Sequence, residues 1–131
     1  MPKAISDYGY VIAVENLLSN IKEVSQTSFD FIHNLEEERL PESVELSLFR
    51  ITQEAINNIL KYAEATRVFI QLMIHENSIV LTIEDNGKGF EVDEQDMTKG
   101  FGIRSIKHRT KALGGFCDID SSKGNGTMIT V

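Results

Sequence analysis

The stretch EDNGKGF, residues 84–90, follows an alternating apolar run at residues 78–83 that predicts a β-strand. The carboxylate of Asp85 would then lie at the end of the strand, and Gly87 and Gly89 would let the backbone approach a ligand closely. The alternative is purely structural, because Asn-Gly is a favoured two-residue turn of β-hairpins. The rest of the chain has to decide between a ligand site and a hairpin turn.

Composition limits what such a site could bind. The chain has 131 residues, and 13 Lys and Arg against 20 Asp and Glu give a formal net charge of −7. This length suits one domain with its own core. The acidic balance argues against a general nucleic-acid or anionic-membrane binder, since both need a basic surface. Without an apolar run of roughly 20 residues or a signal peptide, we expect a cytoplasmic domain with no direct membrane contact. The single cysteine, Cys117, is expected to be a buried thiol.

Apolar periodicity predicts a mixed α/β architecture. The strands do not alternate with helices in a regular βαβ period, so we expect one mixed sheet with helices on one face. The strand nearest the N-terminus is a candidate edge strand. Helices are predicted at residues 8–24, about 41–63 and 103–113, and strands at residues 27–33, 67–75, 78–83, 116–121 and 127–131.

The helix at about 41–63 has two stripes. Glu54, Asn58 and Lys61 fall at i, i+4 and i+7, so they share a polar face. This face is either an ordinary solvated surface or a ligand site, since Glu and Asn offer oxygens to a hard cation and Lys offers positive charge to phosphate. The apolar stripe that should face the sheet consists of Leu48, Ile51, Ala55, Ile59 and Tyr62.

Two further glycine pairs follow. Gly100 and Gly102 precede the predicted helix at 103–113, where free backbone N–H groups can hold an anion. The third pair, in the sequence GNGT at residues 124–127, is either a hairpin turn or part of a ligand site. Other chemistries lack their patterns. The three histidines do not have zinc-site spacing, no nucleophile elbow occurs, and the dinucleotide fingerprint lacks its third glycine.

The order of these motifs resembles the ATP-binding domain of the GHKL superfamily, shared by histidine kinases, gyrase-type topoisomerases, mismatch-repair ATPases and heat-shock chaperones. FRITQEAINNILKYA at 49–63 resembles the N box, and DNGKG at 85–89, GFG at 100–102 and GNGT at 124–127 resemble the three glycine boxes. LPESVEL at 40–46 and GIRSIKHR at 102–109 are similar to the sensor histidine kinases that partner LuxR/NarL-type response regulators. The resemblance covers about residues 8–131. It implies the Bergerat ATP-binding fold, a two-layer α+β sandwich with a mainly antiparallel sheet.

The resemblance also implies roles at the adenine end of a nucleotide pocket. The residue matching Asp85 accepts a hydrogen bond from the adenine amino group, which suits an acceptor-only carboxylate. Gly87 and Gly89 let the backbone pass beside the base. Thr127 lies where the family closes the adenine pocket.

At the phosphate end, Asn58 matches the family's Mg²⁺ ligand and Lys61 would add positive charge. Glu54 matches the catalytic glutamate, which polarises the attacking group or orders a metal-bound water. Gly100 and Gly102 would cradle the phosphates of ATP at the start of a helix.

The resemblance further implies the domain plan. Residues 1–131 would be a single catalytic and ATP-binding domain, with 1–10 as the tail of a preceding dimerisation region and 91–99 as the ATP lid. One departure is Tyr62, which stands where many relatives have a histidine.

We expect the chain to be part of a longer kinase, because none of its histidines lies in a phosphoacceptor context. Alone it should be monomeric and should bind Mg²⁺-ATP without autophosphorylation. Its partners would be the kinase's own dimerisation helices and, indirectly, the response regulator. Two alternatives stay open, namely a serine kinase of the anti-sigma-factor type and a nucleotide-binding module without catalysis.

Overall fold

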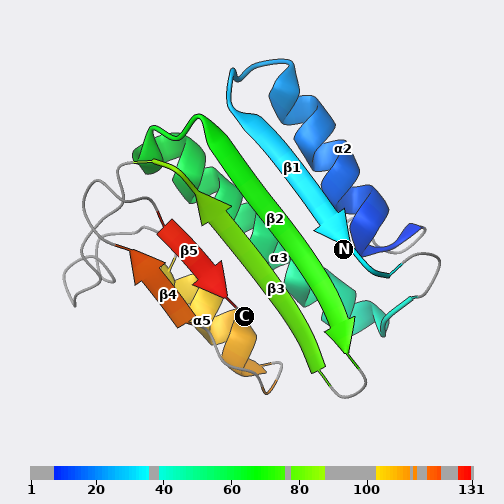
Figure 1. Ribbon diagram of the computed structural model, residues 1–131. Helices are drawn as coiled ribbons and strands as arrows, with labels where there is room; N and C mark the ends of the chain where they lie inside the picture. Colours follow the sequence, from blue (N-terminus) through cyan, green and yellow to red (C-terminus); the bar gives the residue numbers. More distant parts are fainter. Residues whose placement is uncertain are drawn as a thin grey trace.

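The computed structural model describes residues 8–35, 39–75, 78–87, 103–112, 114, 118–121 and 127–130. Five strands form one sheet in the order β1-β2-β3-β5-β4 (Figure 1). In chain order the elements are α2 (Tyr10–Lys22), β1 (Ser28–His33), α3 (Glu42–Asn58), the π-helical turn η1 (Ile59–Ala63), β2 (Arg67–His75), β3 (Ser78–Asp85), α5 (Ile103–Ala112), β4 (Asp118–Ser121) and β5 (Thr127–Thr130).

The sheet is mixed and mainly antiparallel, as expected. β1 runs parallel to β2, whereas the pairs β2–β3, β3–β5 and β4–β5 are antiparallel. Parallel neighbours need a long crossover connection, and α3 supplies it between β1 and β2. The prediction that the first strand lies at an edge is confirmed.

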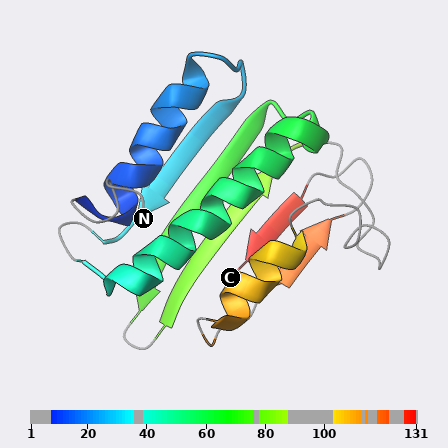
Figure 2. The same cartoon turned by 180° about the vertical axis from the view of Figure 1, so that it is seen from behind.

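The three helices form a second layer on one face of the sheet (Figure 2). α2 lies over β1, α3 crosses the middle of the sheet, and α5 packs beside α3 over β4 and β5. The predicted two-layer α+β sandwich is therefore confirmed. Within the described residues, no helix has both the length and the apolar character needed to cross a bilayer.

The core lies between the two layers. Alternate residues of the central strands point toward the helices, and Ile70, Leu72 and Leu81 are fully buried. From the other layer, α3 buries Leu48, Ile51, Ala55 and Ile56, in agreement with most of the predicted apolar stripe. The side chain of Tyr62 lies outside the described residues.

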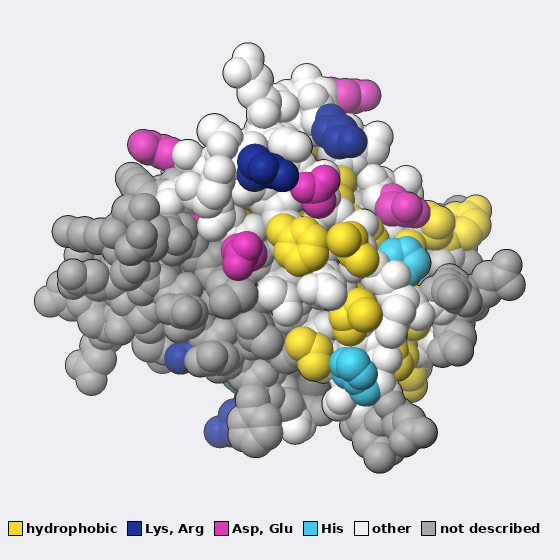
Figure 3. All heavy atoms as spheres, viewed as in Figure 1, with side chains coloured by type: hydrophobic (Ala, Val, Ile, Leu, Met, Phe, Trp, Pro, Cys, Tyr) yellow, Lys and Arg dark blue, Asp and Glu magenta, His cyan; other side chains and the backbone are white. Residues whose placement is uncertain are grey.

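The opposite face of the sheet carries hydrophobic side chains among charged ones (Figure 3). Ile32 of the edge strand is 50% exposed there, and Phe69, Met73 and Val80 are half-buried. This face is exposed to solvent, as is common for an antiparallel sheet that is covered by helices on one side only.

Most predicted element bounds agree with the structure, and the differences are instructive. β2 matches its predicted range of 67–75. β3 was predicted to end at residue 83 but continues to Asp85, because Asp85 still pairs with Val68 on one side and Thr127 on the other. β4 is described from Asp118 onward, and the first two residues of its predicted range, Phe116 and Cys117, lie outside the described residues. The helix at 41–63 ends in the π-helical turn η1.

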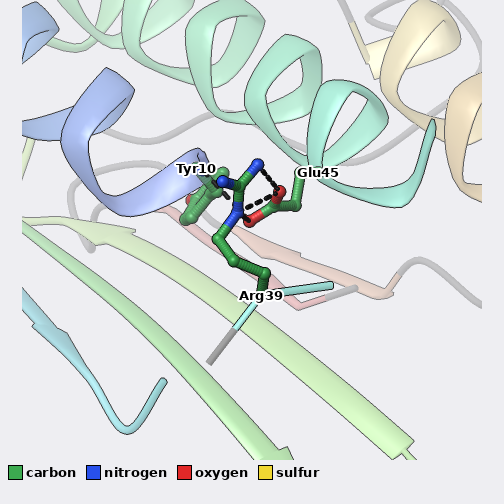
Figure 4. A network of polar contacts seen from close by, with 3 residues as sticks. All are labelled: Tyr10, Arg39 and Glu45. Carbon is green, nitrogen blue, oxygen red and sulfur yellow. Dashed lines mark hydrogen bonds and ion pairs between the residues drawn. The ribbon is translucent and has the colours of Figure 1, made fainter. Parts of the chain in front are cut away.

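A polar network joins the start of α2 to the start of α3 (Figure 4). The buried carboxylate of Glu45 accepts two hydrogen bonds from the Arg39 guanidinium, from Nε at 3.0 Å and Nη2 at 2.9 Å. It also accepts the backbone N–H of Tyr10 at 3.3 Å. The Tyr10 hydroxyl reaches Thr52 Oγ1 at 2.7 Å in the core. The network satisfies polar groups that would otherwise be buried without partners.

Candidate nucleotide site

The candidate site residues of α3 lie near its C-terminal end, where the helix continues into η1. Glu54 and Asn58 are half-buried on this helix, and the neighbouring Asn57 is exposed. Lys61 lies in η1 and is exposed. A π-turn contains more residues than an α-turn, so Lys61 is rotated from the position that α-helical i+7 spacing predicts. Glu54 and Asn58 therefore share the predicted face, while Lys61 lies in the π-helical turn that follows the helix.

The carboxylate of Asp85 lies at the end of β3 in a dry environment. Asp85 is 5% exposed, and its partner across the ladder, Val68, is 1% exposed, so both face the helix layer. Burial raises the pKa of Asp85 above its ordinary value, the N–H of Gly87 opposes this by donating to Oδ1 at 2.7 Å, and the charge of Glu84 raises it further. One carboxylate oxygen is thus held by the backbone, and the group remains an acceptor when ionised.

The two sets of residues come together at one end of the fold. α3 ends beside the end of β3 and the start of β2, as both ribbon views show (Figures 1 and 2). Thr127 begins β5 and is the backbone partner of Asp85 in the antiparallel ladder. Asp85 and Thr127 are therefore neighbours in the sheet although they are far apart in the chain, and α3 ends at the same end of the fold.

Other predicted site residues lie outside the described part of the chain, namely Gly89, Gly100 and Gly102, together with the segment 91–99. Gly87 is described and buried, two residues after the end of β3. α5, which follows Gly102, begins toward the end of the layer where α3 ends and runs back beside it (Figure 2).

The hairpin alternative for residues 86–87 is wrong. The next described strand after β3 is β4, and it pairs with β5 rather than with β3. Both sides of β3 are paired up to Asp85, by β2 and by β5, so no strand formed after residues 86–87 could pair with β3 as a hairpin partner. Asn86 lies opposite Arg67 and donates its backbone N–H to the Arg67 carbonyl at 3.2 Å.

Asn58 and Glu54 carry side-chain oxygens, which are the donors that Mg²⁺ takes. Among the described residues, no group of three or more His, Cys, Asp or Glu is close enough to hold a metal ion. Mg²⁺ does not require such a cage, because it usually keeps several waters and binds one or two protein oxygens together with phosphate. Asn58 and Glu54 are half-buried residues one helical turn apart, and their side-chain oxygens could bind a metal ion in this way.

Comparison with known proteins identifies the family. The family described as "Histidine kinase-, DNA gyrase B-, and HSP90-like ATPase" matches residues 43–131. The chain belongs to this ATPase family. Among its relatives is the signal transduction histidine-protein kinase/phosphatase DegS of Bacillus subtilis, 34% identical over 99% of this chain and 35% of that protein. The sensor protein VraS of Staphylococcus aureus (strain COL) is 31% identical over 99% of the chain and 37% of that protein. The chain thus spans about a third of the length of these relatives.

Solved structures confirm the fold of this ATPase-family domain. The blue-light activated histidine kinase of Erythrobacter litoralis aligns over 89% of the chain and 39% of its own, with a TM-score of 0.69 and 18% identity. The ATP binding domain of PrrB from Mycobacterium tuberculosis aligns over 86% of the chain and 83% of its own, with a TM-score of 0.60 and 17% identity. The expected ATP-binding fold of histidine kinases is therefore confirmed.

Sequence reasoning missed two features of the site. The side chain of Asn86 was read only as part of a turn, yet it bonds the segment that enters β2. The π-helical turn that carries Lys61 was read as ordinary α-helix. The Asn86 bonds had one signal in the sequence, namely an Asn-Gly pair directly after a strand whose alternation continues to Asp85. No residue pattern signals the π-helical turn.

Proposed function

We propose that this chain binds Mg²⁺-ATP and is the catalytic and ATP-binding part of a two-component sensor histidine kinase. In the intact protein, the γ-phosphate would pass to a histidine on separate dimerisation helices. The observation that carries the proposal is the buried carboxylate of Asp85, which lies at the same end of the fold as the polar end of α3. A desolvated, acceptor-only group suits recognition of the exocyclic amino group of adenine.

Each residue has a role in this proposal. Asp85 binds the adenine amino group, with Gly87, Gly89 and Thr127 around the base. Asn58 holds Mg²⁺, Lys61 adds positive charge near the phosphates, and Gly100 and Gly102 cradle the phosphates at the start of α5. Glu54 is the catalytic residue that orients the attacking group. When bound, Mg²⁺ would neutralise charge on the phosphates, and positioning by the protein would supply most of the remaining catalysis.

The domain plan is part of the same proposal. Residues 1–131 form one domain, residues 1–10 continue a preceding dimerisation region, and residues 91–99 form the ATP lid. The domain works in the cytoplasm. On its own it is a monomer, and in the intact kinase the dimerisation helices bring two copies together. Its kinase serves a LuxR/NarL-type response regulator, a proposal supported by the similarity of residues 40–46 and 102–109 to that subfamily.

Isothermal titration calorimetry with ATP, with and without Mg²⁺, tests the nucleotide site. Asp85→Ala should weaken ATP binding by more than about tenfold, because a hydrogen bond to a charged group is lost. The matched control is Glu84→Ala, since Glu84 is the adjacent acid but is exposed on the opposite face. Equal affinities for these two variants would contradict the adenine role of Asp85.

A second pair of variants tests the metal role. Asn58→Ala should reduce the factor by which Mg²⁺ strengthens ATP binding, whereas Asn57→Ala should not, because Asn57 is an exposed amide off the shared face. If both variants keep the full effect of Mg²⁺, Asn58 is not the ligand.

Phosphoryl transfer is tested by adding separately produced dimerisation helices of a related kinase. Acid-labile phosphate on the helices, lost in Glu54→Gln while ATP binding persists, would support the histidine kinase. Acid-stable phosphate would point to a serine kinase, and absence of transfer with intact ATP binding would point to a binding module.

A further inference from the structure

The side chain of Asn86 ties the end of β3 to the segment that enters β2. Its Oδ1 accepts the backbone N–H groups of both Thr66 and Arg67 at 2.9 Å. Its Nδ2 donates to Thr66 Oγ1, also at 2.9 Å. We call these three bonds the Asn86 clasp. They fix which way the amide points, because the opposite orientation would bring its NH₂ group against two N–H donors.

The clasped segment is also held from its other side. Thr27 Oγ1 donates to the Ala65 carbonyl at 3.2 Å, and the N–H of Ser28 donates to the Thr66 carbonyl at 2.8 Å. The segment follows directly after η1, where Glu64 has a left-handed backbone with φ 54°. Thr66 and Arg67 therefore lie between the strand start of β1 and Asn86, immediately after the helix that carries Asn58 and Lys61.

The clasp connects the two halves of the candidate site. Asn86 stands between Asp85, whose carboxylate is buried, and Gly87, whose N–H bonds that carboxylate. Its partners connect through a short segment to Lys61 and the end of α3. A displacement of Asn86 would move both neighbours at once, and it would change their separation from the helix end.

We propose that Asn86 is a positioning residue for nucleotide binding, which sets the adenine-binding end of the site relative to the phosphate-binding end through its bonds to Thr66 and Arg67. The proposal rests on the proposed function. Asn86 need not touch the nucleotide in this role. Its effect on affinity passes through Asp85 and Gly87, and a purely stabilising role would leave affinity unchanged in the folded protein.

The chain contains a matched control, Asn34, which bonds the other end of β2. Asn34 follows β1, and its side chain accepts the N–H of Ile74 at 2.7 Å and donates to the Ile74 carbonyl at 3.0 Å. Both asparagines are exposed and both bond the backbone of β2 or its approach. Only Asn86 lies at the site end. Asn34→Ala therefore removes a comparable clasp without touching the proposed site.

A conservative variant tests whether the hydrogen bonds of Asn86 matter or its amide group as such. In Asn86→Asp, a carboxylate oxygen can accept both N–H groups, and the Thr66 hydroxyl can turn to donate to the other oxygen. All three bonds are kept. The new charge lies beside Asp85, where it adds to that of Glu84 and raises the pKa of Asp85 further.

The experiment compares the wild type with Asn86→Ala, Asn86→Asp and Asn34→Ala by ADP titration calorimetry and thermal unfolding. At about pH 8, where carboxylates are ionised, Asn86→Ala should weaken ADP binding about tenfold, the size of one hydrogen bond between Asp85 and the nucleotide that is lost when Asp85 is misplaced. Asn86→Asp should keep affinity within about twofold, and its loss of affinity on acidification should begin at higher pH than in the wild type. Asn34→Ala should lower the melting temperature as Asn86→Ala does but keep wild-type affinity.

Two results would overturn the inference while the proposed function stands: ADP affinity unchanged in Asn86→Ala, or equally reduced in Asn34→Ala. Failure of the wild type to bind ADP would instead refute the proposed function and the inference with it. Hydrogen exchange of the Thr66 and Arg67 amides, faster in Asn86→Ala but not in Asn86→Asp, would verify that the clasp was opened as intended.

Discussion

Tyr10 and Thr52 form a buried pair of hydroxyl groups. The direction of the hydrogen bond between them determines which of the two substitutions, Tyr10→Phe or Thr52→Val, costs more stability. Thr52 Oγ1 donates its only proton to the Leu48 carbonyl at 2.9 Å. Tyr10 must therefore be the donor in the 2.7 Å bond between the two hydroxyls. Burial also raises the pKa of the Tyr10 hydroxyl, which keeps the proton on it.

The direction makes the two single substitutions unequal. Tyr10→Phe removes a donor but leaves Thr52 bonded to the Leu48 carbonyl, so we expect a loss of about 1 kcal/mol in unfolding free energy. Thr52→Val leaves a buried Tyr10 hydroxyl without an acceptor and should cost about 2 kcal/mol. The double variant has no orphaned polar group, since the Leu48 carbonyl keeps its helical N–H partner. It should cost only about 1 kcal/mol.

Urea unfolding followed by circular dichroism measures these differences, provided that the slope with denaturant stays constant. The coupling between the two sites should be about 2 kcal/mol in this double-mutant cycle. Tyr8→Phe is the control, because the Tyr8 side chain is 64% exposed and should tolerate loss of its hydroxyl. Additive single effects, or a larger cost for Tyr10→Phe than for Thr52→Val, would refute the reasoning.

Three further predictions concern pH, backbone conformation and core packing. Burial raises the pKa of Asp85 above its ordinary value of 3.8, so its contribution to stability is full below that value and is lost as pH rises through the folded pKa. Asp85→Asn keeps an acceptor for Gly87 without ionising, so its stability in urea titrations should rise relative to that of the wild type as pH increases through the folded pKa of Asp85, while ATP affinity is lost. Gly9→Ala should lower the melting temperature, because φ is +89° and the new Cβ would lie 2.6 Å from Arg39 Nε; the backbone alone costs about 1 kcal/mol. Ile70→Ala, at a fully buried central position, should lower the unfolding free energy by about 3 kcal/mol in urea unfolding. A loss no larger than that of Ile32→Ala, at a half-exposed position, would contradict the assignment of Ile70 to the core.

The regular parts of the fold were predictable from local pattern alone. In β2, Val68, Ile70 and Leu72 recur at every second position. The polar residues Arg67 and His75 flank this run, and together these signals are enough to place both ends of the strand. β3 was predicted too short because Glu84 and Asp85 are residue types that strands seldom contain. The alternation nevertheless continues through them, with Glu84 exposed and Asp85 buried. A carboxylate in a buried strand position was itself a signal for a candidate site.

The unpredicted features depend on contacts between distant parts of the chain. Glu45 and Thr52 are polar residues on α3 that the structure buries completely, and their partners Arg39 and Tyr10 come from other segments. Periodicity describes which face a residue lies on, but it does not reveal which polar groups will meet there. The Asn86 clasp belongs to the same class, since Thr66 precedes it by 20 residues.

The parallel pairing of β1 with β2 has a consequence for how the domain forms and opens. The β2–β3 hairpin brings neighbouring residues together, whereas Ser28 meets Arg67 only after α3 has crossed between the strands. Closing that loop costs chain entropy before any contact is gained, so the hairpin should form early and β1 should join it late. The same edge strand, with α2 packed on it, should be the first unit to separate in native-state hydrogen exchange. The N-terminal unit could then detach and return while the central strands that carry Asp85 stay paired.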